Sequence, residues 1–131
     1  MGIKVSWADD NRTIIQATYG DRWGWDDWRR ADDQTQALLD AVEHPVGLIL
    51  DARRAAIPPD IVVRFPRIAQ TAPGLTSPKV HTVVVVGKTF TLNSLVGLMK
   101  RLYPDTAAEV EVVPTLEEAF IVVRESAPTA H

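Results

Sequence analysis

The sequence predicts an α/β fold, in which a mostly parallel β-sheet carries an antiparallel strand at its N-terminal edge. Residues 46–50 and 83–86 form short, continuous apolar runs of the kind that is buried on both faces of a parallel sheet. Segments with helical spacing separate these runs. The length of 131 residues corresponds to a single domain. Together these observations predict the order ββαβαβαβα with right-handed crossovers.

An N-terminal β-hairpin is the first expected element. Ile3, Val5 and Trp7 alternate with polar residues, and residues 8–11 supply turn-forming side chains. The β-forming segment 13–19 follows the turn and ends before Gly20. Two strands joined by so short a turn pair in the antiparallel direction.

The first helix is expected to begin at Trp25 and to end at His44 and Pro45, since the residue before a proline disfavours the helical conformation. Asp26 and Asp27 lie in its first turn, where the helix dipole favours carboxylates. Its apolar face has helical spacing and comprises Trp25, Trp28, Ala31, Thr35, Leu38, Leu39 and Val42.

The remaining chain repeats the pattern of strand and helix. Strand 46–51 ends in a carboxylate, and a weaker helix opens at residues 58–60 and is interrupted by Pro66. Strand 80–86 then leads to a helix that reaches about residue 103. The last strand covers 109–113.

A capping box marks the start of the final helix. Thr115 is placed to accept a hydrogen bond from the backbone three residues on, and Glu118 is placed to reach back. The apolar residues Leu116, Ala119, Phe120 and Val123 follow with helical spacing.

Composition excludes several functional classes. The chain has 17 acidic and 14 scattered basic residues and a net charge of −3, which argues against nucleic-acid binding. It contains no cysteine, so disulfides, thiolate metal sites and a cysteine nucleophile are excluded. The three histidines share no metal-ligand spacing, and we expect neither a metal nor another cofactor. The N-terminus lacks the apolar core of a signal peptide and no apolar run is long enough for membrane insertion, so a cytoplasmic location is expected.

Three local features accompany the order of elements: the entry to the first helix at 23–28, the strand segment 44–51 and the cap segment 114–119. In pattern and spacing the chain resembles uncharacterised bacterial members of the SpoIIAA-like, or STAS-like, domain superfamily. The resemblance covers about residues 3–124. It implies one domain at 1–125, followed by a flexible C-terminal tail at 126–131.

The resemblance also implies a binding module. STAS domains of sigma-factor control are switched by phosphorylation of a serine at the start of the helix after the third strand. Residues 55–62 occupy that position here and contain neither serine nor threonine, so this switch cannot be carried over. Asp60 lies close to the expected hydroxyl and is either a charged mimic of the phosphorylated residue or a plain helix cap.

The candidate site lies where the carboxyl ends of the strands meet, because ligands of open parallel sheets bind there. We expect segments 20–25, 51–59, 87–93 and 114–115 to share this edge. Its candidate binding residues are Trp23, Asp51, Arg53, Asp60, Lys88, Thr89 and Thr91. No catalytic residue is assigned.

Each candidate has two interpretations. Trp23 is either a partner contact or a packing residue. Asp51 stands beside Arg53 and Arg54, and this arrangement either orients a ligand or ties down the following loop through hydrogen bonds. Lys88, Thr89 and Thr91 are placed to hold a small anion, although strand residues stand where the glycine of a P-loop would be required.

The crossover rule also predicts an exposed apolar surface. If all helices gather on one side of the sheet, the other side lacks cover. Trp7 would then be exposed with Ile14 and Thr18, or with Ile15, Ala17 and Tyr19. Such a surface favours a homodimer or the docking of another protein.

Three functions are compatible with these patterns. The first is a non-enzymatic, STAS-like protein-interaction domain with a regulatory role. The second is a carrier of a small apolar or lipid-like ligand. A SpoIIAA-like core resembles that of CRAL-TRIO domains, and Phe65, Phe90 and the tryptophans are available to line a pocket. The small size of the chain argues against this function. The third is an enzyme with a site at the carboxyl ends of the strands, near Asp51 and Lys88.

Overall fold

The computed structural model describes residues 2–55, 64, 77–102 and 110–126. The strands form one five-stranded sheet in the order β1-β2-β3-β4-β5. β1 is antiparallel to β2, and the remaining neighbours are parallel. The predicted α/β class with an antiparallel N-terminal strand is therefore confirmed. The elements are β1 (Ile3–Trp7), β2 (Ile14–Tyr19), α1 (Trp25–Asp40), β3 (Val46–Asp51), β4 (Val80–Val86), α3 (Thr89–Leu102), β5 (Val110–Val113) and α5 (Leu116–Ser126).

Two predicted segments lie largely or wholly outside the described residues. Of the helix expected after residue 58, only Arg64 is described, and it is helical. Of the expected tail, residues 127–131 lie outside the description, while Ser126 is the last residue of α5.

Side-chain caps hold the short connections in place. In the turn between β1 and β2, the Asp9 carboxylate accepts hydrogen bonds from the Thr13 hydroxyl, the Thr13 N–H at 2.8 Å and the Ile14 N–H at 3.2 Å. Burial alone would raise the pKa of Asp9, but these hydrogen bonds outweigh it and hold the pKa below its ordinary value. The ionised Asp9 carboxylate therefore stabilises the turn between β1 and β2.

The prediction that the first helix ends at His44 and Pro45 is wrong, because α1 ends at Asp40. The two ends of α1 are stabilised differently. At the N-terminus, Asp27 accepts the backbone N–H of Gly24 at 2.8 Å and pairs with Arg30 at 2.6 Å. At the C-terminus, the ammonium group of Lys79 donates to the carbonyls of Leu39 and Val42, each at 2.9 Å. The first cap is local, whereas the second joins α1 to the segment that leads into β4.

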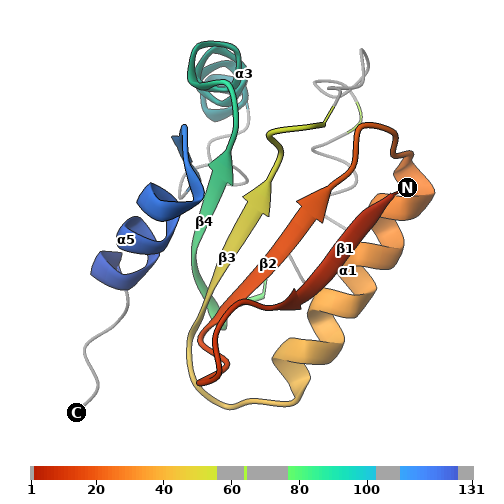
Figure 1. Ribbon diagram of the computed structural model, residues 1–131, viewed down its shortest axis with the longest axis vertical. Helices are drawn as coiled ribbons and strands as arrows, with labels where there is room; N and C mark the ends of the chain where they lie inside the picture. The colour runs from red at the N-terminus through yellow and green to blue at the C-terminus, as the bar shows by residue number, and fades with distance from the viewer. Residues whose placement is uncertain (1, 56–63, 65–76, 103–109, 127–131) are drawn as a thin grey trace.

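The sheet has a helix on each face (Figure 1). α1 covers the face that carries Ile15 and Leu48, and Leu39 of the helix joins them in one buried cluster. α5 covers the opposite face, where Val123 packs with the strand residues Ile14 and Ile49. The core is thus divided by the sheet into two apolar layers.

The predicted exposed surface on the first two strands is wrong. Ile14, Ile15, Ala17 and Tyr19 are all buried, and Trp7 is half-buried against the cluster under α1. The crossover rule constrains helices between parallel strands, but α5 follows the last strand and folds back onto the other face. The exposed residues beyond its cover are polar, namely Lys4, Ser6 and Thr18.

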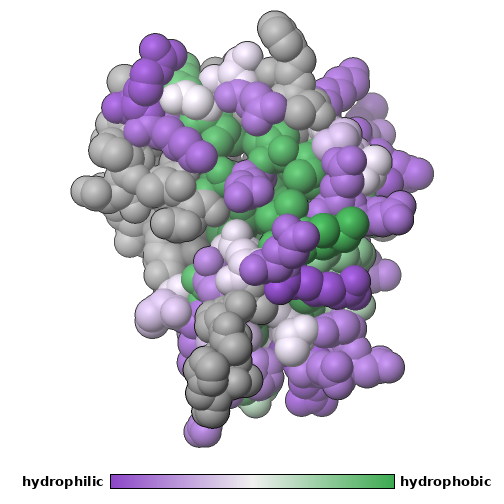
Figure 2. Space-filling view, turned by 90° about the vertical axis from the view of Figure 1, so that its left-hand side faces the viewer, coloured by the Kyte–Doolittle hydropathy of each residue, from purple (hydrophilic) through white to green (hydrophobic). Residues whose placement is uncertain are grey.

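Apolar surface appears instead on the side of the molecule that carries α5. Figure 2 looks onto this side and shows hydrophobic residues gathered near its centre, with hydrophilic residues around them. Ile121 of α5 is 47% exposed and is the only large hydrophobic side chain that is exposed in the described part of the chain. Within the same residues, no helix has the length and apolar character that a membrane span requires.

Candidate functional site

The carboxyl ends of four strands lie along one edge of the sheet, as expected. Thr18 pairs with Asp51, Asp51 with Val86, and Val86 with Val113. This row is continuous because β2 to β5 are parallel and in register at their ends. In Figure 1 the arrowheads of β2, β3 and β4 accordingly point to the same end of the molecule.

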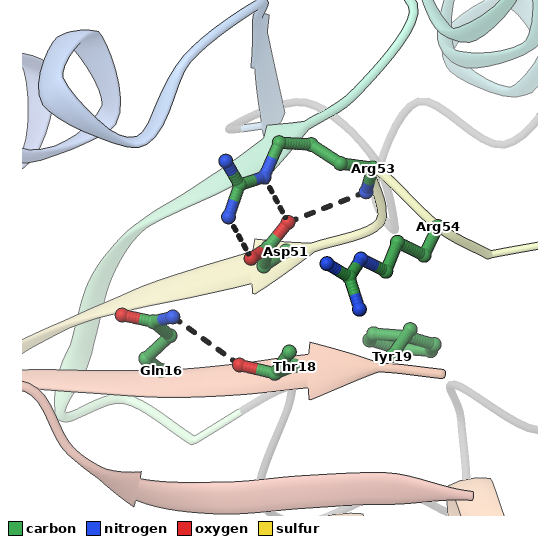
Figure 3. A pocket seen from close by; sticks show the side chains of 6 residues that line it. All are labelled: Gln16, Thr18, Tyr19, Asp51, Arg53 and Arg54. Atoms are coloured by element: carbon green, nitrogen blue, oxygen red, sulfur yellow. Dashed lines mark hydrogen bonds and ion pairs between the residues drawn. The ribbon is translucent and has the colours of Figure 1, made fainter. Parts of the chain in front are cut away.

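A partly open pocket of about 290 Å³ occupies the β2 and β3 part of this edge. Gln16 and Thr18 share one face of β2, because strand side chains alternate, and Thr18 lies directly beside Asp51 of β3. The chain then turns after β3 and adds two arginines (Figure 3). The pocket is lined by Gln16, Thr18, Tyr19, Asp51, Arg53 and Arg54.

Asp51 and Arg53 form the fixed part of the pocket. The Asp51 carboxylate is only 4% exposed, and it accepts hydrogen bonds from Arg53 Nε at 2.9 Å and Nη2 at 2.8 Å. The backbone N–H of Arg53 adds a third bond at 3.3 Å. The hydrogen bonds from the Arg53 side chain are the main cause of a lowered Asp51 pKa and outweigh the opposite effect of burial. Asp51 therefore ties down the loop after β3, one of its two predicted roles.

Arg54 and Thr18 form the part of the pocket that remains available. Arg54 is exposed and makes no hydrogen bond or ion pair with another described residue. The Thr18 hydroxyl accepts a hydrogen bond from the Gln16 amide at 3.2 Å, so its own hydrogen is left to donate. Figure 3 shows the Arg54 guanidinium extending between Asp51 and Tyr19.

Aromatic side chains pack beside the pocket in an edge-to-face series. Ring centroids are 5.2 Å apart for Tyr19 and Trp23, 5.4 Å for Trp23 and Trp25, and 6.4 Å for Trp25 and Trp28. The Arg64 guanidinium lies 5.9 Å from the centre of the Trp25 ring. Trp28 is buried and Trp23 is half-buried, so Trp23 contributes to packing whether or not a partner also contacts it.

The other predicted site residues are either placed outside the pocket or not described. Lys88 is exposed on the same edge of the sheet, beyond β4, and does not line it. Thr89 is the first residue of α3, and Thr91 lies in the same turn; the side chains of both are outside the description. Asp60 also lies outside the described residues. The predicted edge is thus found, and of the predicted residues whose side chains are described, Asp51 and Arg53 line its pocket while Trp23 and Lys88 do not.

Sequence reasoning missed Gln16, Thr18 and Tyr19 as pocket residues. The alternation of polar and apolar residues in β2 was the available signal, because it places Gln16 and Thr18 on one face. It did not reveal that this face meets Asp51, since strand register is a tertiary property. Among the described residues no group of histidine, aspartate and glutamate is arranged to hold a metal ion.

Replacing Asp51 with asparagine should remove a pH-dependent part of the stability. Because the folded-state pKa of Asp51 is lowered, its contribution is present above the ordinary value of 3.8 and is lost as the pH falls further. Urea unfolding at pH 7 should show a loss of about 1–2 kcal/mol, and the difference from wild type should shrink toward pH 3. Asp33→Asn, an exposed change on α1, is the matched control and should show no such gap at either pH. A loss that is equal at both pH values would contradict the assigned ion pair.

Comparisons with known proteins assign no family to this chain: no protein-family model matches it, and no match was found among curated proteins or solved structures.

Proposed function

We propose that this chain is a non-enzymatic protein-interaction domain that docks a partner through the pocket at the carboxyl ends of β2 and β3. The observation that carries the proposal is the different pairing of the two arginines in this pocket. Arg53 is held by the buried Asp51, while the neighbouring Arg54 is exposed and lines the same pocket as Thr18. Such a surface offers directed hydrogen-bond donors on a rigid support, which suits recognition.

The chemistry of the lining favours binding over catalysis. A general acid or base works best when its pKa lies near the working pH. Here burial raises the pKa of Tyr19, and the hydrogen bonds from Arg53 lower that of Asp51, so both move away from neutrality. Arginine, glutamine and threonine side chains do not titrate near pH 7. Among the described residues, the lining therefore contains no group suited to proton transfer.

The same lining favours a polar partner over an apolar ligand. Pockets that carry lipid-like molecules are lined mainly by apolar side chains. All six described residues around this pocket are polar or charged at their side-chain ends, and Tyr19 is buried with its ring in the aromatic series. The apolar-carrier hypothesis gains no support from it.

The wider setting of the proposal rests on the sequence. A STAS-like architecture with right-handed crossovers agrees with the sequential strand order, and STAS domains are binding modules. A cytoplasmic location and a regulatory role belong to the same proposal. The partner is another protein or a second copy of this chain, and exposed Ile121 on α5 supplies apolar surface for self-association.

Selection from a displayed random-peptide library tests the docking function. The wild-type protein should enrich one or more peptide families. Arg54→Glu should weaken binding of the enriched peptides by about tenfold or more, because it replaces an exposed donor by a repelling charge. Isothermal titration of the synthetic peptides against both proteins measures the difference.

Arg29→Glu is the matched control, since Arg29 is an exposed arginine on α1, the helix of the opposite face. It should bind the peptides as wild type does. No enriched family, or families that bind Arg54→Glu unchanged, would refute docking at this pocket. Native mass spectrometry of the protein alone then assigns the partner class, since a dimer mass that Arg54→Glu abolishes identifies a second copy.

A further inference from the structure

The charges in the pocket identify the kind of group that it accepts. Asp51 and Arg53 neutralise each other through a two-point ion pair. Arg54 adds one positive charge that no described residue pairs. The charges of Asp51, Arg53 and Arg54 therefore sum to about +1, and the negative charge among them is the buried Asp51 carboxylate.

A single carboxylate matches this charge better than a phosphate group. A phosphorylated side chain carries about −1.5 to −2 at neutral pH. The excess negative charge would face the Asp51 carboxylate, which is 4% exposed and cannot move away, because it is held by three hydrogen bonds from Arg53. A carboxylate carries one charge and fits the planar fork of an arginine.

Donor geometry agrees with the charge. The Thr18 hydroxyl accepts from Gln16 at 3.2 Å and has its hydrogen left to donate. Arg54 lies across the same pocket on the loop after β3. A carboxylate placed between them would receive hydrogen bonds from two elements, while Arg53 stays engaged with Asp51.

We infer that the pocket binds the carboxylate of an acidic side chain on the partner, with Arg54 and Thr18 as its donors. This inference rests on the proposed docking function and specifies its chemistry. The inference commits to an acidic side chain of a protein partner as the source, because the pocket is partly open and leaves room for the rest of a partner outside it. A chain terminus and a free carboxylate are alternative outcomes of the test.

Titration of ¹⁵N-labelled protein with blocked amino acids tests the inference. The probes are N-acetylglutamate α-amide, the neutral N-acetylglutamine amide and inorganic phosphate, all at constant ionic strength. The glutamate probe should cause saturable shifts at the Arg54 side-chain Nε–H and at the backbone N–H groups of Thr18 and Arg54. The glutamine probe should cause none, and phosphate should bind more weakly than the glutamate probe.

Three variants of the pocket and one control variant give the residue-level readout. Arg54→Gln should weaken the glutamate probe by about tenfold, and Thr18→Val by about threefold, as expected for one charged and one neutral donor. Arg54→Lys should recover part of the loss, since it restores the charge without the fork. Arg29→Gln should bind as wild type does. Backbone spectra of each variant show whether the fold is retained, and Arg54 is exposed, so its replacement leaves the core intact.

The outcomes separate the inference from the function on which it rests. Equal binding of the glutamine probe, tighter binding of phosphate, or an unchanged Arg54→Gln variant would each overturn the carboxylate assignment. Enriched peptides that depend on Arg54 but retain affinity when every acid is replaced would overturn it too, while leaving docking intact. Saturable, Arg54-dependent binding of the glutamate probe without any enriched peptide would support the carboxylate site and refute docking. Acceptance of acetate or a free C-terminal carboxylate in preference to the side-chain probe would overturn the assigned source.

Discussion

Replacing Gly47 with alanine should destabilise the protein by about 2–3 kcal/mol, the cost expected when one carbon is forced into a filled core. A Cβ atom at Gly47 would lie 2.2 Å from Cγ1 of Val123 in α5, far inside van der Waals contact. Val123 is 2% exposed and β-branched, and such a side chain has one strongly preferred rotamer in a helix. The clash therefore has to move α5 or β3. Urea denaturation followed by far-ultraviolet circular dichroism measures the loss.

Gly97→Ala is the matched control for this prediction. Gly97 lies within α3, and an added Cβ atom there meets nothing within 4 Å. The change should leave stability unaltered or raise it by up to about 1 kcal/mol through helix propensity. In addition, combining Gly47→Ala with Val123→Ala should cost at least about 1 kcal/mol less than the sum of the two single changes. Strict additivity would show that the two residues are not in contact.

Trp28→Ala should have the largest effect of any single change in the aromatic series, with a loss of about 3–5 kcal/mol in the free energy of unfolding. Trp28 is 8% exposed, packs with Ala17 and Tyr19, and makes a hydrogen bond to the Tyr19 side chain. Truncation would leave a cavity between α1 and the sheet and remove the partner of a buried hydroxyl. Equilibrium unfolding by circular dichroism is the appropriate measurement, because the substitution itself alters tryptophan fluorescence.

Two further variants give this prediction its controls. Trp28→Phe keeps an aromatic ring but removes the indole N–H, so it should recover most of the stability that Trp28→Ala loses. Trp23→Ala should cost only about 1–2 kcal/mol, because Trp23 is half-buried and touches the series at its edge. A loss at Trp23 as large as that at Trp28 would show that the whole turn before α1 is a core element, with no surface to spare for a partner.

The elements that sequence reasoning predicted well are those determined by neighbouring residues. The Thr115 hydroxyl accepts the Glu118 N–H at 3.1 Å, as the capping pattern predicts. Asp26 and Asp27 lie in the first turn of α1, also as predicted. Both features depend on residues that are at most one helical turn apart, so the local sequence pattern contains all the information that is needed to predict them.

The features that sequence reasoning missed depend on segments that are distant along the chain. A glycine in a strand gives no indication that Val123 of a later helix will fill the space above it. Lys79 gives no indication that it will cap α1. The predicted apolar surface on the first two strands was wrong for the same reason, because the side of the sheet that α5 covers does not follow from any rule about crossovers.

The candidate site also combines features that neighbouring residues determine with features that depend on distant segments. Strand ends and parallel pairing follow from local apolar runs and from the order of elements, so the sequence by itself determined the α/β class, the order of the described strands and helices, and the edge of the sheet at which a site should lie. It did not determine the end of α1, which lies at Asp40 and not at the predicted His44. Only the tertiary structure decided that Thr18 meets Asp51, that Arg53 is occupied while Arg54 is available, and that Lys88 lies outside the pocket. The physical reason is that strand register, helix docking and ion pairing are settled by the packing of segments far apart in the chain, whereas turns, caps and periodicity are settled within a few residues.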